Sequence, residues 1–258
     1  MFSQEERETF AQKGLIKREG FIPPHKIKAA RQVILKQLEK AGVWVDGEWL
    51  FHNYNAPISP DYGAKLVKPI KRHKDILAVA EDEGPAAASD LLNGREVFPM
   101  SYAALLFTLP YTTEWSIPAK AWHLDLPRLP ENGIPGVQMF AFINTVQPQG
   151  GGTLVVTGSH QLLNEGRRIS SNQLRKKLKQ EPYFADLLSD QSTDRQRFLD
   201  ESVEVEGHNM QVVEMVGKPG DVYFMDLRLL HTIAPNANTT PRMMLTQRYL
   251  LESAIAAI

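Results

Sequence analysis

Apolar residues recur at helical spacing in the first part of the chain and at strand spacing after about residue 100. A helix is predicted from about Pro24 to Ala41, ended by Gly42. Its apolar positions repeat every three or four residues: Ile27, Ala30, Ile34, Leu38 and Ala41. The pair Ser3 and Glu6 has the pattern of a capping box, which predicts a shorter helix to about Lys13. Two more helical pieces, KDILAVAEDEG and AAASDLLNG, each end in glycine.

Short apolar or alternating runs, separated by Gly, Pro and Asn, fill the second part and indicate strands. The runs are SYAALLFTLP, VQMFAFINTV, GTLVVTG, SVEVEG, MQVVEMV, DVYFMDL and RMMLTQRYLL. They favour an antiparallel barrel or a double-sheet jelly roll. The polar stretch at about 161–207 contains helical segments and interrupts the strands. We therefore expect an α+β fold in one domain over 1–258, with a helical part at about 1–95, a core at about 100–250 and this insertion.

Composition narrows the classes of function. The formal charge of the 258 residues is −1 and no cysteine is present. A near-neutral, mixed surface has no general attraction for nucleic acid or anionic lipid, and no apolar run approaches the length of a membrane span. The N-terminal segment is too polar for a signal peptide, so we expect a cytoplasmic protein. A metal site would have to use His, Asp or Glu.

Candidate metal chemistry begins at WHLD, where His123 and Asp125 are two residues apart. On a strand both side chains would share a face. Such a pair is equally typical of an exposed polar strand, so a third ligand is needed. His231 follows the apolar run GDVYFMDLRLL, and we expect it at the end of a core strand. Two histidines and one carboxylate form the facial triad of non-haem Fe(II) oxygenases.

Five other histidines have no obvious partner: His25, His52, His73, His160 and His208. Each is interpreted as a surface imidazole or a buried one with its hydrogen bonds satisfied. Arg242, eleven residues after His231, opens the last apolar run. A buried arginine needs an anionic partner, and its planar fork suits a carboxylate. An exposed position at the start of the strand is the alternative.

Three segments, WHLD, GGTLVVTGSH and PGDVYFMDLRLLHTIAPNANTTPRMMLTQRY, together resemble the phytanoyl-CoA dioxygenase family of Fe(II)/2-oxoglutarate-dependent oxygenases. The resemblance implies a double-stranded β-helix (jelly-roll or cupin-like) core. It makes His123, Asp125 and His231 the iron ligands and Arg242 the anchor of the cosubstrate 2-oxoglutarate. It also implies that Thr153 and Phe140 line the cosubstrate pocket. Ile233 departs from the family, where a small polar residue is common.

The implied activity is oxidation of a small molecule, most simply hydroxylation of a substrate such as a natural-product intermediate, with O₂ and 2-oxoglutarate converted to succinate and CO₂. Asp125 favours this over halogenation, because halogenating relatives have a small residue there. Two alternatives stay open: a non-catalytic jelly-roll binding protein, and a metal-dependent hydrolase with the same ligands. The sequence does not indicate the substrate, the oligomeric state, or whether the insertion forms a lid.

Overall fold

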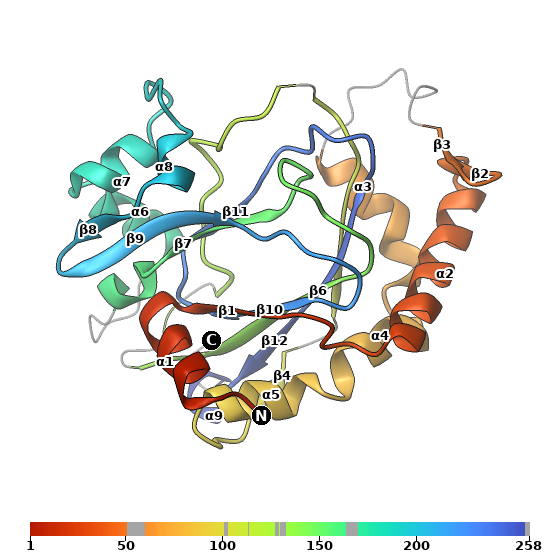
Figure 1. Cartoon of the computed structure of the whole chain (residues 1–258), viewed down its shortest axis with the longest axis horizontal. Helices are drawn as coiled ribbons and strands as arrows, with labels where there is room; N and C mark the ends of the chain where they lie inside the picture. The colour runs from red at the N-terminus through yellow and green to blue at the C-terminus, as the bar shows by residue number, and fades with distance from the viewer. Residues whose placement is uncertain are drawn as a thin grey trace.

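The computed structural model describes residues 1–50, 60–100, 103–112, 114–126, 129, 133–163 and 170–255. Two antiparallel sheets pack face to face in it, and helices cover their outer faces (Figure 1). Within the described residues, no helix is both long and apolar enough to cross a bilayer.

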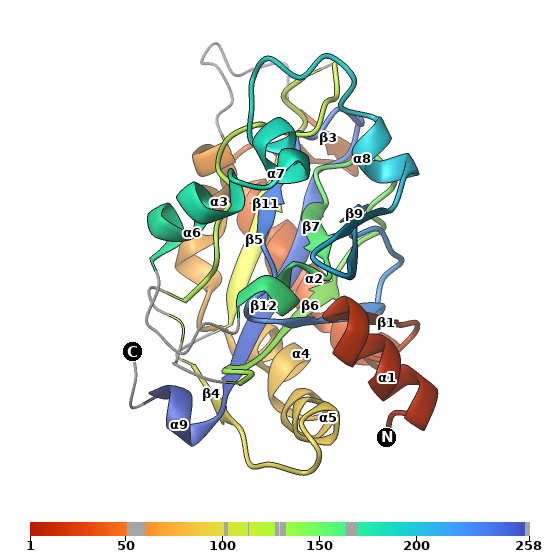
Figure 2. The same cartoon turned by 90° about the vertical axis from the view of Figure 1, so that its left-hand side faces the viewer.

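The larger sheet has the strand order β1-β10-β6-β12-β4, and β5 also pairs with β12. Its strands are β1 (Leu15–Arg18), β4 (Phe98–Pro99), β5 (Ala104–Thr108), β6 (Gly136–Phe142), β10 (Val222–Asp226) and β12 (Arg242–Leu250). The long strand β12 pairs with β5 at one end and with β4 at the other (Figure 2). β6 pairs with β12 over Met244–Leu250, so β12 has a partner on both sides over most of its length.

The smaller sheet has the order β11-β7-β9-β8. Its strands are β7 (Thr153–Thr157), β8 (Val203–Val205), β9 (His208–Glu214) and β11 (His231–Ile233). A separate ribbon pairs β2 (Trp44–Val45) with β3 (Glu48–Trp49). Because β6 and β7 follow each other in sequence but lie in different sheets, the connection between them crosses from one layer to the other.

Helices flank the sandwich on both sides. The first group is α1 (Gln4–Lys13), α2 (Pro24–Lys40), α3 (Pro60–Val67), α4 (Lys74–Glu81) and α5 (Gly84–Leu91). The second group is α6 (Ser171–Leu178), α7 (Pro182–Leu187) and α8 (Arg197–Asp200), and α9 (Glu252–Ile255) follows the last strand. Single 3₁₀ turns are η1 (Lys68–Ile70) and η2 (Ser159–Leu163). In Figure 1 the second group lies beside β8 and β9, away from α2–α5.

Alternation along the strands sorts the apolar residues into separate clusters. On β6, Met139 and Ala141 face the cluster formed with the N-terminal helices, whereas Phe140 and Phe142 face the interior between the sheets. On β7, Val155 joins that interior, whereas Leu154 and Val156 pack against the cluster that contains the side chains of α6–α8. The sandwich thus presents one inner and two outer apolar faces, and each is covered.

The predicted fold class is confirmed, including the flanking N-terminal helices and the helical insertion. The capping box is also confirmed, because Ser3 Oγ accepts the amide of Glu6 and the Glu6 carboxylate accepts the amide of Ser3. The single-domain organisation stays a prediction.

Two local expectations were wrong. His123 and Asp125 do not lie on a regular strand, since His123 forms an isolated bridge and Leu124–Leu126 turns away. His231 opens the short strand β11 of the smaller sheet instead of ending the strand that begins at Val222. The cause is a tight turn after β10, in which the amide of Leu229 donates to Asp226 O and Arg228 pairs with the Asp226 carboxylate.

Candidate metal centre

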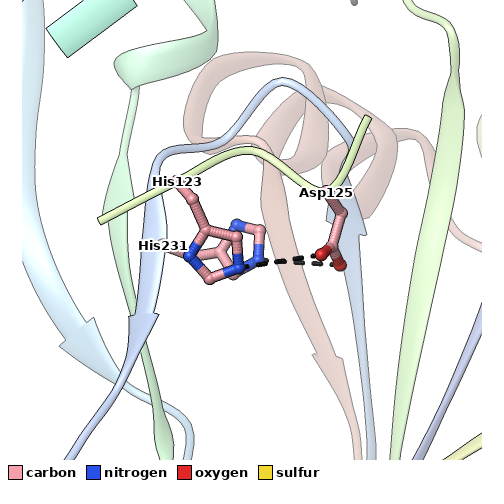
Figure 3. Close-up of side chains that lie close together, drawn as sticks. All are labelled: His123, Asp125 and His231. Carbon is pink, nitrogen blue, oxygen red and sulfur yellow. Dashed lines mark ion pairs between the residues drawn. The ribbon is translucent and has the colours of Figure 1, made fainter. Parts of the chain in front are cut away.

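His123, Asp125 and His231 converge in space, with potential ligand atoms within 4.8 Å of one another. Both imidazole rings face the Asp125 carboxylate (Figure 3). His123 Nε2 lies 3.7 Å from Asp125 Oδ1, and His231 Nε2 lies 3.6 Å from Oδ2. Within the part of the chain that the structure describes, this is the one group of three or more such side chains placed to hold a metal ion.

The two histidines are joined through their backbones. The amide of His123 donates to His231 O at 2.9 Å, and the amide of His231 donates to His123 O at 3.1 Å. The ring centroids are 4.4 Å apart. This bridge attaches the segment before Asp125 to β11, which itself pairs with β7. The relative positions of the three side chains therefore depend on the smaller sheet.

A backbone carbonyl oxygen fixes each imidazole. His123 Nδ1 lies 2.8 Å from Ala121 O, and His231 Nδ1 lies 3.0 Å from Leu229 O. Because a carbonyl only accepts, each Nδ1 carries a hydrogen, and this bond turns each Nε2 toward the Asp125 carboxylate. Ala121 adopts a left-handed φ of 66°, a conformation that costs a non-glycine residue about 1 kcal/mol. The strain falls on the residue that orients His123.

Arg248 pairs with Asp125, with Nη2 3.1 Å from Oδ1. Burial by itself would raise the pKa of Asp125, but the neighbouring His231 and the charge of Arg248 outweigh it and hold that pKa well below its usual range. Burial, together with the nearby His231, lowers the pKa of His123. The carboxylate is therefore ionised and His123 neutral near pH 7, the forms that bind a metal ion.

Exposure differs among the three side chains. The His231 side chain is 5% exposed and that of Asp125 16%, whereas that of His123 is 42% exposed. The centre is therefore closed on the β11 side and accessible from solvent beside His123.

Arg242 is 2% exposed at the start of β12, where it pairs in register with Thr108. The alternative of an exposed arginine is thus wrong. Its Nε and Nη1 are buried and have no hydrogen-bond partner among the described residues. Burial lowers its pKa to about 10, so the guanidinium stays charged at neutral pH. Two orphaned donors of a buried cation suit the carboxylate of a ligand.

Thr153 and Phe140 are both buried. Thr153 begins β7 opposite Ile233, whose side chain is exposed. Phe140 belongs to the interior cluster, together with Val155 and Met244. Their roles next to a cosubstrate stay predictions.

The remaining histidines lie outside the triad. His25 and His73 are exposed, and His208 is half-buried. His160 is buried, and its Nε2 lies 3.0 Å from Ala11 O, but its Nδ1 has no partner among the described residues. His52 lies outside the described residues.

Sequence reasoning missed Arg248. Its one available signal is spacing, because Arg242, Met244, Thr246 and Arg248 alternate onto one face of β12. Arg248 lies six residues after Arg242, so it shares a face with Arg242 in a strand that is otherwise mostly apolar. A second arginine on that face is unusual for such a strand. The sequence does not indicate that its partner is Asp125.

Comparisons with known proteins agree with the predicted family. The model of the family "Phytanoyl-CoA dioxygenase (PhyH)" matches residues 10–244. No curated protein matches the chain.

Three solved structures show the same fold. The non-heme alpha ketoglutarate dependent carbocyclase SnoK from nogalamycin biosynthesis is 18% identical, with 96% of this chain and 84% of that chain covered and a TM-score of 0.54. HygX from Streptomyces hygroscopicus, with nickel and 2-oxoglutarate bound, is 14% identical over 98% and 88%, with a TM-score of 0.56. EctD from S. alaskensis, with 2-oxoglutarate and 5-hydroxyectoine, is 19% identical over 98% and 77%, with a TM-score of 0.57.

Proposed function

Because the chain belongs to the phytanoyl-CoA dioxygenase family, we propose that it uses Fe(II) and 2-oxoglutarate to hydroxylate a small molecule. The family makes it a dioxygenase-type oxidoreductase. The observation that supports the proposal is the combination of a two-histidine, one-carboxylate donor set with a buried arginine, two of whose donors have no partner among the described residues.

The donor set fits iron. Two imidazole nitrogens and one carboxylate oxygen on one side of an ion leave other positions open, which is the facial triad of non-haem Fe(II) oxygenases. We assign His123, Asp125 and His231 as the ligands. When bound, iron and 2-oxoglutarate supply the oxidising chemistry, in which O₂ and 2-oxoglutarate yield succinate, CO₂ and one oxygen atom for the substrate.

The protein supplies placement. The carbonyls of Ala121 and Leu229 hold the two Nε2 atoms toward the ion, and Arg248 holds the carboxylate. Arg242 would pair with the remote carboxylate of 2-oxoglutarate and so fix its orientation. Thr153 and Phe140 would line the same pocket.

Hydroxylation, not halogenation, is proposed because a carboxylate is present at position 125. The Asp125 oxygens lie within 4 Å of both imidazoles. They fill the position that a halide ligand would need.

A substrate screen tests the proposal. Purified protein with Fe(II), 2-oxoglutarate and O₂ is incubated with small-molecule pools, and products are read by mass. We expect a gain of one oxygen, with succinate formed in equal amount. Turnover that survives iron removal or needs no 2-oxoglutarate would favour the metal-dependent hydrolase, and binding without turnover would favour a binding protein.

A further inference from the structure

We propose that Arg248 is a positioning residue that makes Asp125 a metal ligand through one oxygen only. The inference rests on the proposed function, because it assigns a task to a residue that contacts one of the three predicted ligands. Arg248 Nη2 lies 3.1 Å from Asp125 Oδ1. Oδ1 also lies 3.7 Å from His123 Nε2, whereas Oδ2 is 3.6 Å from His231 Nε2. The printed contact of the guanidinium is thus with Oδ1, the carboxylate oxygen that faces His123.

The backbone of Arg248 is held in place from two sides. Arg248 pairs in register with Gln138 of β6, and its carbonyl oxygen accepts the amide of Met100 at 2.8 Å. The guanidinium Nη1 lies 4.0 Å from the sulfur of Met100. The side chain is 30% exposed. The side chain thus extends from a fixed position on β12 to the Asp125 carboxylate, and part of it is exposed to solvent.

Next to Arg248, on the same face of the larger sheet, buried polar side chains are joined by hydrogen bonds. Gln138 Nε2 donates to Thr246 Oγ1 at 3.0 Å, and Thr246 Oγ1 donates to Met139 O at 2.8 Å. Thr246 and Gln138 are both nearly inaccessible to solvent. These bonds order the side chains that neighbour Arg248 on that face of the sheet.

The contact between Arg248 and Asp125 affects how many donor atoms the protein would offer to a metal ion. A free carboxylate can bind a metal ion through one oxygen or through both. The positive charge of Arg248 beside Oδ1 would disfavour a second cation at that oxygen, so Oδ2 would be the donor to the ion. The protein would then contribute three donor atoms, one each from His123, Asp125 and His231, and would leave room for the cosubstrate and O₂.

A lysine at position 248 would orient the Asp125 carboxylate only in part. Its ammonium keeps the charge beside Asp125 but lacks the planar fork that fixes the direction of approach. Loss of a partner that orients a metal ligand typically lowers metal affinity by about 10–100-fold. Arg248→Met should show the full effect and Arg248→Lys an intermediate one.

The test uses Co(II) alone as the probe, titrated into the metal-free full-length protein. Affinity is measured by calorimetry, and the visible absorption of the bound Co(II) reports its coordination. Arg18→Met is the matched control, because Arg18 is 33% exposed and pairs with a carboxylate, Glu6 Oε1 at 2.6 Å, on another part of the surface. Thermal melting of each variant checks that it is folded.

We expect Arg248→Met to bind Co(II) about 10–100-fold more weakly than wild type and to change its absorption spectrum. Arg248→Lys should lie between, and Arg18→Met should match wild type. Wild-type Co(II) affinity and spectrum in Arg248→Met would overturn the proposal. This holds even if the variant raises the KM for the organic substrate, because that result would mean that Arg248 contacts the substrate instead. Should Arg248→Met not fold, a wild-type spectrum and affinity in Arg248→Lys would overturn it. A wild-type protein that binds no Co(II) would instead contradict the proposed function.

Discussion

His123 and His231 lie far apart in the sequence, yet each donates its backbone amide to the carbonyl oxygen of the other. Their rings sit with centroids 4.4 Å apart, and both face Asp125 (Figure 3). A backbone bridge places two potential ligands more firmly than side-chain packing alone. The geometry of the centre thus depends on the sandwich as well as on the WHLD segment.

Asp125→Ala should abolish turnover and weaken metal binding. Loss of a direct donor should cost at least as much as the ~100-fold that loss of an outer partner can cost. Co(II) titration and succinate formation measure the two effects. The matched control is Asp90→Ala, because Asp90 has a similarly exposed side chain (19%) and pairs with Arg7 at 3.0 Å. Equal losses of Co(II) affinity in both variants would show that the effect is general destabilisation.

Arg242→Met should raise the KM for 2-oxoglutarate on the order of 100-fold, because two charge-assisted hydrogen bonds are worth about 3 kcal/mol together. The same variant should melt at a higher temperature than wild type without 2-oxoglutarate, because two donors of the buried guanidinium have no partner in the part of the chain that the structure describes. Relief of about 1 kcal/mol would raise Tm by about 2–4 °C. A lower Tm in the ligand-free variant would mean that Arg242 already has a stabilising partner in the protein.

Arg195→Met should loosen the segment that leads into His123. The Arg195 guanidinium donates to four backbone carbonyls, those of Ile117, Pro118, Leu187 and Ser189. It thereby ties the insertion to the chain just before the triad. We expect a loss of roughly 1–3 kcal/mol in unfolding free energy and faster amide exchange at 117–126.

The control for this variant is Arg197→Met. Arg197 lies in the same insertion and pairs with Asp186 at a more exposed position, where an ion pair contributes little. Unchanged amide exchange at 117–126 in Arg195→Met would show that Arg195 does not stabilise the segment before His123.

Tyr249→Phe should destabilise the fold and leave the metal centre intact. The buried hydroxyl of Tyr249 donates to Ala80 O at 2.6 Å, a carbonyl in the last turn of α4 that has no partner within the helix. Its loss should cost about 1 kcal/mol, which lowers Tm by about 2–4 °C. Urea unfolding measures the cost, and Co(II) affinity should equal that of wild type. A weaker Co(II) affinity would show that α4 packing reaches the centre.

Much of the fold follows from local signals. The capping box of Ser3 and Glu6 and the apolar spacing from Ile27 to Leu38 are sufficient to predict α1 and α2. The inner and outer positions of β6 alternate. By contrast, β1 is a short LIKR run that was not predicted, because it is a strand only through its pairing with β10.

The three side chains that the structure brings together were predicted from the sequence, but their supporting geometry was not. His123, Asp125, His231 and Arg242 carry recognisable spacing. The contact of Arg248 with Asp125 and the His123–His231 bridge join distant segments, so no sequence period reveals them. The turn that places His231 in the second sheet contains the Asp226–Arg228 ion pair. The spacing of apolar residues does not predict this pair either.

Metal-dependent binding of 2-oxoglutarate is the most direct test of the central claim that the triad and Arg242 form one site. Calorimetric titration of 2-oxoglutarate into Co(II)-loaded protein should show one binding event per chain. That event should be lost in metal-free protein and weakened on the order of 100-fold in Arg242→Met. Equally tight binding without metal, or wild-type affinity in Arg242→Met, would contradict the claim.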